Sequence, residues 1–161
     1  MVQTAYLLLG SNLGDRRQLL LETRRRLEPG IGRVVQSSSV YETTPWGNAD
    51  QPAYLNQVLA LETLLTPPEL MMATQRLEES LGRVRSAAKW EPRSIDIDIL
   101  YFGRLVWYTP GIAIPHPLLH QRRFALVPLV EVAPDFRHPE LRKTNIDLLE
   151  ECEDPGKVIK L

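Results

Sequence analysis

The sequence contains almost no cysteine and no long apolar run. Cys152 is the only cysteine among the 161 residues, so no disulfide can form within the chain, and a reducing compartment is expected. No apolar run approaches the roughly 20 residues that a membrane-spanning helix needs, and the first residues carry no basic region typical of a signal peptide. These absences predict a soluble protein of the cytoplasm that has no membrane partner.

An excess of charge of either sign is also missing. The chain carries 19 Lys and Arg residues against 20 Asp and Glu residues, which leaves a formal net charge of -1. Proteins that bind nucleic acid mainly through its phosphates are usually basic, so no nucleic-acid partner is expected. With 43% hydrophobic and 24% charged residues, the composition is that of one globular domain spanning residues 1–161.

A third absence concerns nucleotide binding. The sequence contains no G-x-x-x-x-G-K-[ST] segment, the glycine-rich loop that cradles phosphates in P-loop proteins. A P-loop site is therefore excluded. Any ATP bound by this chain would have to be held by arginine side chains and metal ions instead.

Short apolar segments and turn residues predict elements in the order strand, helix, strand, strand, helix, strand. The expected ranges are about 5–10, 16–28, 33–42, 55–63, 67–81 and 93–100. Asp15 is expected to cap the first helix, and Thr66 with Glu69 forms a capping-box pattern before the second. This order predicts an α+β, ferredoxin-like βαββαβ core, an antiparallel sheet with both helices on one face. A further helix near 124–132 and a C-terminal extension, 134–161, follow this core.

The segment 93–100 is the most informative one, because isoleucines alternate in it with two aspartates. On a strand, this alternation places Asp96 and Asp98 on one face, about 6.6 Å apart, opposite the isoleucines. Two adjacent carboxylates repel each other unless a cation lies between them, and carboxylate oxygens suit Mg²⁺. Two interpretations are open: the solvated outer face of an amphipathic strand, or a site for one or two Mg²⁺ ions.

Three arginines approach this aspartate pair along the sequence. Arg83 and Arg85 follow the second predicted helix, and Arg93 begins the aspartate segment. They could form a solvated basic loop, or a clamp that neutralises phosphate oxygens while Mg²⁺ bridges the phosphates to the aspartates. The second interpretation describes a site for phosphoryl transfer.

Further side chains could hold the reactants. His116 lies between two prolines, ahead of Arg122; it is either a structural loop residue or a phosphate contact. Aromatic residues and one amide occur in or near the two longest loops: Trp46, Tyr54, Trp90, Phe124 and Asn56. Each aromatic ring could pack in the core. Alternatively, the rings together could stack on a flat heterocycle while the amide forms hydrogen bonds with its edge.

Taken in order, these segments resemble the 6-hydroxymethyl-7,8-dihydropterin pyrophosphokinases of the folate pathway. The segments that carry the resemblance are 6–13 (YLLLGSNL), 41–56 (YETTPWGNADQPAYLN), 75–85 (QRLEESLGRVR), 90–103 (WEPRSIDIDILYFG), 114–116 (IPH) and 122–124 (RRF). Its core, W-x-P-R-x-[ILV]-D-[ILV]-D followed by F-G and P-H, is highly specific. The resemblance implies a ferredoxin-like enzyme that transfers pyrophosphate from ATP to the pterin hydroxymethyl group and releases AMP. It also implies two Mg²⁺ ions, and we expect a monomer.

The resemblance further implies roles for individual residues. Those implied to contact ATP are Gln75, Glu78, Arg83, Arg85, Trp90, Arg93, Ile99, His116 and Arg122. Those implied to contact the pterin are Thr43, Thr44, Pro45, Trp46, Tyr54, Asn56, Trp90, Asp96 and Phe124. Those implied to be catalytic are Arg83, Arg93, Asp96 and Asp98, and the two aspartates are the implied metal ligands.

Two other function classes compete with this interpretation. A different Mg²⁺-dependent phosphoryl or nucleotidyl transferase could use the same D-x-D pair. An RNA-binding module could share the βαββαβ order, but the aromatic-rich [KR]-G-[FY]-[GA]-F-V-x-[FY] strand typical of that class is missing from the sequence.

Overall fold

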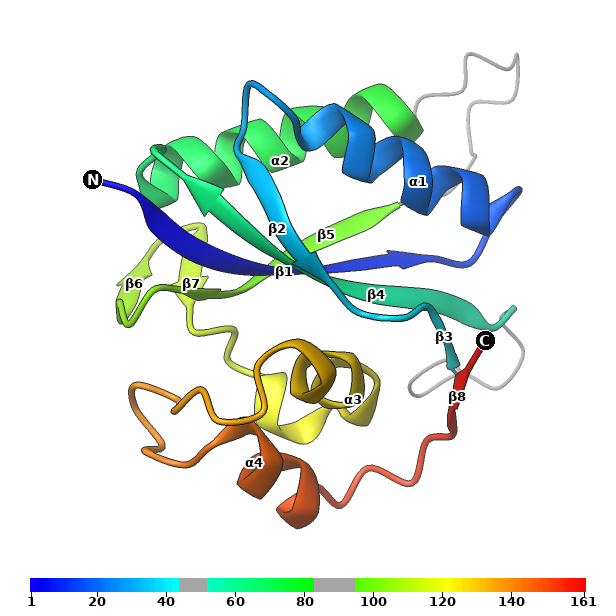
Figure 1. The fold of residues 1–161 in the computed structure, drawn as a ribbon, viewed down its shortest axis with the longest axis vertical. Coiled ribbons are helices and arrows are strands. Elements are labelled where there is room, and N and C mark those ends of the chain that lie inside the picture. The colour runs from blue at the N-terminus through cyan, green and yellow to red at the C-terminus, as the bar shows by residue number, and fades with distance from the viewer. Residues whose placement is uncertain (44–51, 83–94) are drawn as a thin grey trace.

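The computed structural model describes residues 1–43, 52–82 and 95–161 (Figure 1). Within these ranges, one sheet contains the strands β1 (Gln3–Ser11), β2 (Arg33–Ser37), β3 (Tyr41–Thr43), β4 (Tyr54–Thr63), β5 (Asp96–Phe102) and β8 (Val158–Lys160). The α-helices are α1 (Arg16–Leu27), α2 (Pro67–Gly82), α3 (Arg123–Val132) and α4 (Asn145–Glu151). A hairpin of β6 (Trp107–Thr109) and β7 (Ile112–Ile114) follows β5, and a short 3-10 turn, Leu119–Gln121, precedes α3.

The strand order confirms the predicted fold class. It runs β5-β1-β4-β3-β8, with β2 paired to the other end of β4, and the pairs are antiparallel. The strand β1 thus lies between β4 and β5, while α1 connects β1 to β2 and α2 connects β4 to β5. This is the ferredoxin-like arrangement expected from the element order.

The prediction of one continuous strand over 33–42 is wrong. The chain forms two short strands there, β2 and β3, which pair with different parts of β4. Ser38 lies between them and bonds to both backbone groups of Val58: its N–H donates to the carbonyl at 2.8 Å, and its hydroxyl accepts from the Val58 N–H at 2.9 Å. A serine side chain therefore takes the place of a regular strand pair, and the strand breaks at this point.

Alternating side chains of the sheet face two layers of helices. One face packs on α1 and α2 through residues that include Leu7, Leu9, Leu59 and Ile97. The other face carries Leu8, Val58, Leu100 and Tyr101, which pack against Leu126 and Leu129 of α3. Figure 1 shows α1 and α2 above the sheet and α3 and α4 below it. The predicted helix near 124–132 therefore covers the face that the βαββαβ core alone leaves bare.

The predicted helix starts are confirmed. The Asp15 carboxylate accepts the backbone N–H of Gln18 at 3.1 Å at the start of α1. Thr66 and Glu69 form the reciprocal capping box, in which the Glu69 side chain accepts the Thr66 N–H at 2.9 Å and the Thr66 hydroxyl accepts the Glu69 N–H at 3.3 Å. Each cap satisfies helix N–H groups that have no partner within the helix.

The C-terminal extension has more structure than its sequence indicates. Residues after 134 form α4, which joins the second core cluster through Leu148, and β8, which pairs with β3. Buried Asn145 accepts a hydrogen bond from the Tyr101 hydroxyl at 2.8 Å and so ties the extension to β5. No helix in the described ranges is long and apolar enough to cross a membrane.

Candidate active site

One row of paired residues crosses the sheet at the end where β5 begins. In this row Asp96 of β5 pairs with Gly10 of β1, Gly10 pairs with Asn56 of β4, and Asn56 pairs with Tyr41 of β3. Directly paired residues of adjacent strands project their side chains to the same face. The register therefore brings a carboxylate and an amide to one face, separated by a residue without a side chain.

The two aspartates occupy this face as the sequence predicts. Asp96 and Asp98 are half-buried, whereas Ile97 and Ile99 between and beyond them are 6% and 4% exposed and belong to the core under α1 and α2. Asp98 pairs with Leu8, which packs on the α3 side of the sheet. The carboxylates thus lie on the α3 face.

Glycine at position 10 leaves space that any other residue would fill. A Cβ atom placed there would lie 2.9 Å from Oδ1 of Asn56 and 3.6 Å from Cδ1 of Tyr54. The first distance is shorter than a normal carbon–oxygen contact, so a side chain would have to displace the amide. Gly10 therefore forms an open floor between Asp96 and Asn56. Glycine inside a strand often marks a close approach of a ligand, and this is the sequence signal for Gly10, which the motifs around Asp96 and Asp98 do not contain.

Asn56 is held in a fixed orientation beside this floor. Its Nδ2 donates to the Thr43 hydroxyl at 2.6 Å, and both residues are buried. Since Nδ2 is directed to Thr43, the carbonyl oxygen Oδ1 is the atom that faces the space over Gly10. Tyr54 lies two residues earlier on the same face of β4, and burial together with the negative charge of Asp96 raises the pKa of its hydroxyl. Tyr54 is therefore protonated at neutral pH.

Glu78 of α2 holds the aspartate strand from the opposite face. Its side chain is 7% exposed, and Oε2 accepts the backbone N–H of Ile97, the residue between the two aspartates, at 2.9 Å. A hydrogen bond that a backbone N–H donates to a carboxylate is stronger than one between neutral groups. Glu78 thereby fixes the backbone that carries Asp96 and Asp98.

His116 lies on the side of the site near Asp98, with Arg122 as a second charged neighbour. The His116 backbone N–H donates to Leu100 of β5 at 3.0 Å, and its Nδ1 accepts the Leu118 N–H at 3.2 Å. Burial lowers the pKa of His116, the Asp98 carboxylate raises it, and Arg122 lowers it, with a lowered net value. The ring is therefore neutral at pH 7 with its proton on Nε2, which is free to donate to an anionic oxygen.

The two carboxylates fit a metal ion that shares its coordination with a substrate. In the described part of the chain, no group of three or more His, Cys, Asp or Glu residues could form a metal site from protein ligands alone. Mg²⁺ typically binds one or two carboxylates and completes its octahedron with phosphate oxygens and water. Asp96 and Asp98 on one face therefore suit Mg²⁺ bound together with a phosphorylated substrate.

Comparison with known proteins decides the family. The model of the family described as 7,8-dihydro-6-hydroxymethylpterin-pyrophosphokinase matches residues 6–134. The chain belongs to this family. The matched region includes Gly10, Asn56, the aspartate pair, His116 and the start of α3.

Relatives and a solved structure support this assignment. The proteins named 2-amino-4-hydroxy-6-hydroxymethyldihydropteridine pyrophosphokinase from Aquifex aeolicus and Pseudomonas aeruginosa are each 41% identical to this chain, over 140 and 159 residues. The alignments cover 87% and 97% of this chain and 86% and 96% of those proteins. The crystal structure of wild-type HPPK-DHPS from Plasmodium falciparum matches with a TM-score of 0.76 at 17% identity, over 94% of this chain and 41% of that longer chain. This structural match shows the fold.

The structure brings together some of the residues that the family resemblance implies. Thr43, Tyr54, Asn56, Asp96 and Asp98 share the α3 face, and His116 lies within electrostatic reach of both Asp98 and Arg122. Phe124 lies in the first turn of α3, with the Arg122 guanidinium carbon 5.6 Å from the centre of its ring. Gln75 is exposed on α2, whereas Ile99 lies in the core and offers no polar side-chain group. Seven implied residues lie outside the described ranges: Thr44, Pro45, Trp46, Arg83, Arg85, Trp90 and Arg93.

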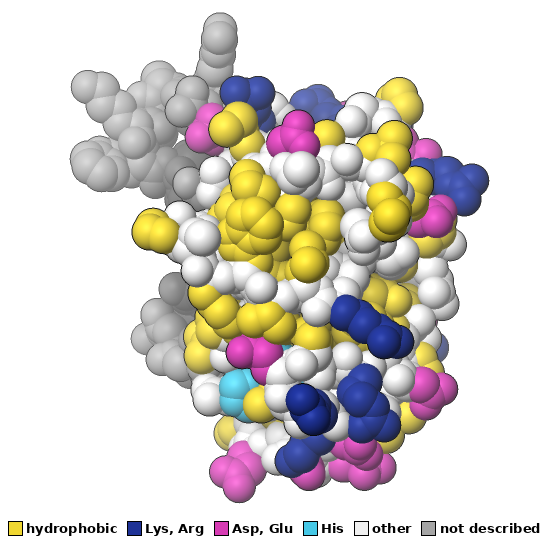
Figure 2. Space-filling model, turned by 90° about the vertical axis from the view of Figure 1, so that its left-hand side faces the viewer, with side chains coloured by type: hydrophobic (Ala, Val, Ile, Leu, Met, Phe, Trp, Pro, Cys, Tyr) yellow, Lys and Arg dark blue, Asp and Glu magenta, His cyan; other side chains and the backbone are white. Residues whose placement is uncertain are grey.

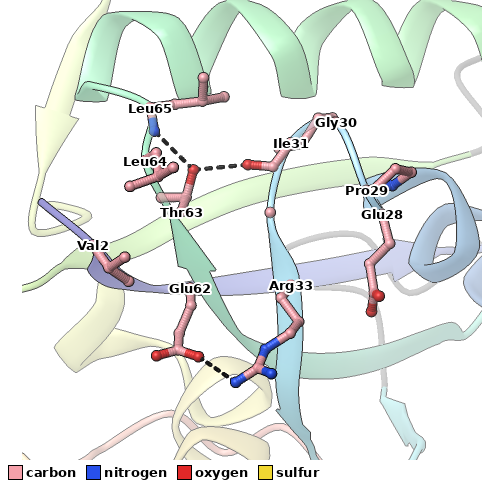
Figure 3. A pocket seen from close by; sticks show the side chains of 11 residues that line it. Val2, Glu28, Pro29, Gly30, Ile31, Arg33, Glu62, Thr63, Leu64 and Leu65 are labelled. Atoms are coloured by element: carbon pink, nitrogen blue, oxygen red, sulfur yellow. Dashed lines mark hydrogen bonds and ion pairs between the residues drawn. The ribbon is translucent and has the colours of Figure 1, made fainter.

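A separate hollow of about 530 Å³ lies at the opposite end of the sheet, near the start of β1 and the end of β4 (Figure 3). Its polar side chains are paired within the protein: Arg33 binds Glu62 at 2.9 Å, and the Thr63 hydroxyl donates to Ile31 at 2.7 Å. Val2 and Leu64 at this end are 52% and 73% exposed, and Figure 2 shows hydrophobic side chains gathered on the face at the left of Figure 1. This end is remote from Asp96 and is not part of the candidate site.

Proposed function

We propose that this protein transfers pyrophosphate from ATP to 6-hydroxymethyl-7,8-dihydropterin, with AMP and the pterin pyrophosphate as products, as a step of folate biosynthesis. Membership of the pyrophosphokinase family supports the activity. One structural observation carries the assignment of the site, namely the row in which Gly10 separates Asp96 from Asn56. This row places a carboxylate, which would serve the phosphates of ATP, and an amide, which would contact the pterin, on the two sides of Gly10.

The amide end of the row suits a pterin. Asn56 Oδ1 faces the floor while its Nδ2 is bound by Thr43, so the side chain offers an acceptor to an N–H group on the edge of the heterocycle. A buried polar group of this kind discriminates strongly against ligands that leave it unpaired. The aromatic side chains of Tyr54 and Phe124 would stack against the ring faces.

The carboxylate end suits a polyphosphate. Asp96 and Asp98 would hold the Mg²⁺ ions, which supply charge neutralisation at the phosphate oxygens when bound. Neutral His116 would donate its Nε2 proton in a hydrogen bond to a phosphate oxygen, and Arg122 would add a positive charge beside it. These groups would act mainly by aligning the hydroxymethyl oxygen with the β-phosphorus and stabilising charge.

Product analysis tests the proposed activity. The purified protein would be incubated with ATP, Mg²⁺ and the pterin alcohol, and the nucleotides would be separated by chromatography, with an EDTA control. AMP and pterin pyrophosphate in equal amounts, formed only in the presence of metal, would support the proposal. Formation of ADP would instead identify a single-phosphate kinase, and transfer of the nucleotide to the acceptor would identify a nucleotidyl transferase.

The cytoplasmic location and the monomeric state expected from the sequence stay predictions. The one cysteine, Cys152, is a buried free thiol, which is compatible with a reducing compartment. Size-exclusion chromatography with light scattering would test the monomer, for which a mass near 18.4 kDa is expected. A mass close to twice that value would contradict it.

A further inference from the structure

The first turn of α3 does not cap itself. In the described structure the N-cap residue of this helix, Arg122, makes no capping hydrogen bond through its side chain. Asp, Asn, Ser or Thr normally fills this position, because the first N–H groups of a helix need acceptors. Two cations, Arg122 and Arg123, also lie at the positive end of the helix dipole, where negative charge is favoured. This turn therefore needs support from another part of the chain.

The C-terminal extension supplies that support. Oδ2 of Asp154 accepts the backbone N–H of Arg123, the first residue of α3, at 3.0 Å, across 31 positions of sequence. The Arg123 side chain returns two hydrogen bonds, from Nε to the Asp154 carbonyl and from a terminal nitrogen to the Cys152 carbonyl, both at 2.9 Å. The other carboxylate oxygen of Asp154 accepts the Gly156 N–H at 2.9 Å and so fixes the side chain. Asp154 is thus a remote cap for α3.

The same extension continues to the heterocycle side of the candidate site. Directly after this cap it forms β8, in which Val158 pairs with Thr43. Thr43 is the residue that orients Asn56. Figure 1 shows the extension running from α4 past the sheet edge to β3. It therefore contacts both α3, whose first turn carries Phe124, and β3, which carries Thr43.

We propose that Asp154 is a positioning residue for the pterin side of the active site, acting through the first turn of α3. By holding the Arg123 N–H, it keeps Phe124 in place to stack on the heterocycle. Asp154 lies in the extension, beyond residues 6–134 that the family model matches. The stacking role of Phe124 in this inference rests on the proposed function.

A set of three variants tests the proposal. Asp154→Ala removes the cap. Asp154→Asn keeps one acceptor oxygen for the Arg123 N–H, but its amide nitrogen cannot accept the Gly156 N–H as the second carboxylate oxygen does. Glu153→Ala removes a neighbouring exposed carboxylate as a matched control. With Asp154→Ala we expect the KM for the pterin alcohol to rise about fivefold while kcat and the KM for ATP stay within about twofold, as for a lost helix cap. Asp154→Asn should restore part of the affinity, because one of the two acceptor oxygens is kept, and Glu153→Ala should match the wild type.

Amide hydrogen exchange gives a readout that does not need turnover. Asp154→Ala should accelerate exchange at Arg123 and in the following turn, whereas the strands β1 and β5 should keep their protection. Unchanged exchange in α3 would overturn the proposal, as would faster exchange without a change in the pterin KM. If the wild type formed no AMP, the proposed function would fail, and the hydrogen-exchange measurement would still show whether Asp154 holds the turn.

Arg123→Gln is the second variant if Asp154→Ala does not fold. It removes the two contacts to the carbonyl groups but keeps the backbone cap, and it should show a smaller rise in the pterin KM.

Discussion

Asn56 and Thr43 are joined by a buried hydrogen bond of 2.6 Å from the amide nitrogen to the hydroxyl oxygen. This bond decides which atom of the amide faces the floor over Gly10. A side-chain amide can present either a donor or an acceptor, and the two ends differ only by a flip. By binding the nitrogen, Thr43 leaves the oxygen for the ligand, so the hydrogen-bonding pattern of the pocket depends on a residue beside it.

Replacing Thr43 should therefore change pterin recognition. Thr43→Val keeps the shape but removes the acceptor, which leaves the Asn56 amide without its partner at a cost of about 1–3 kcal/mol. We expect the Kd for the pterin to rise about tenfold with little change in ATP affinity, as measured by calorimetry. Thr43→Ser keeps the hydroxyl and is the matched control. Equal pterin affinity of the valine variant and the wild type would show that the bond does not set the orientation.

A side chain at position 10 should block the floor. Gly10→Ala would place a Cβ atom 2.9 Å from Asn56 Oδ1, so the amide or the strand must shift. We expect kcat/KM for the pterin to fall about tenfold or more, since small misplacements of binding groups are costly. Gly30→Ala is the control, because a Cβ atom there meets nothing within 4 Å. Full activity of Gly10→Ala in a steady-state assay would exclude this floor as the substrate site.

Glu78 should affect catalysis through the strand that it holds. Glu78→Ala leaves the Ile97 N–H without its acceptor, and we expect a loss of about 1–3 kcal/mol in the free energy of unfolding. The Mg²⁺ concentration for half-maximal activity should also rise, because Asp96 and Asp98 lose their fixed backbone. Glu79→Ala changes an exposed neighbour on the same helix and should leave both properties unchanged. An unaltered Mg²⁺ dependence in the Glu78 variant would limit Glu78 to a role in stability.

The sequence predicts part of this site because some of its determinants are local. The alternation around Asp96 and Asp98 fixes the face of a strand within a few residues, and the capping box at Thr66 and Glu69 lies within one helical turn. The pairing of Gly10 with Asn56 depends on the register between β1 and β4, and Asp154 caps Arg123 across 31 positions. Such relationships arise only when the chain folds, and so no local pattern could reveal them.

The link between α3 and β3 should depend on pH. Glu131 of α3 accepts hydrogen bonds from the Ser39 N–H at 2.8 Å, from the Ser39 hydroxyl at 3.1 Å and from the Tyr41 hydroxyl. Burial raises the pKa of Glu131, but the hydrogen bonds from Tyr41 and Ser39 lower it more, so it lies below its ordinary value of 4.5. A carboxyl with a lowered pKa stabilises the folded state above the unfolded value, and this contribution is lost as the pH falls below 4.5 through the folded value.

Glu131→Gln should consequently reduce the free energy of unfolding at neutral pH. It should also make that free energy depend less on pH under acidic conditions. We expect the urea midpoint of the wild type to fall more steeply than that of the variant between about pH 5 and pH 3. Denaturation curves at several pH values would measure this difference. If the urea midpoints of the two proteins fell equally with decreasing pH, Glu131 would not contribute to the loss of stability in acid.

Asp96 and Asp98 are proposed to form the metal-dependent centre of a pyrophosphokinase, and the rate of AMP formation as a function of Mg²⁺ concentration would test this role. Wild type, Asp96→Asn, Asp98→Asn and Asp135→Asn would be compared, with Asp135 as an exposed control. We expect AMP from the wild type and from Asp135→Asn, and a loss of about a hundredfold or more in the rate of the two site variants, with the fold retained. AMP formation at the wild-type rate by Asp96→Asn or Asp98→Asn, or without Mg²⁺, would contradict this role.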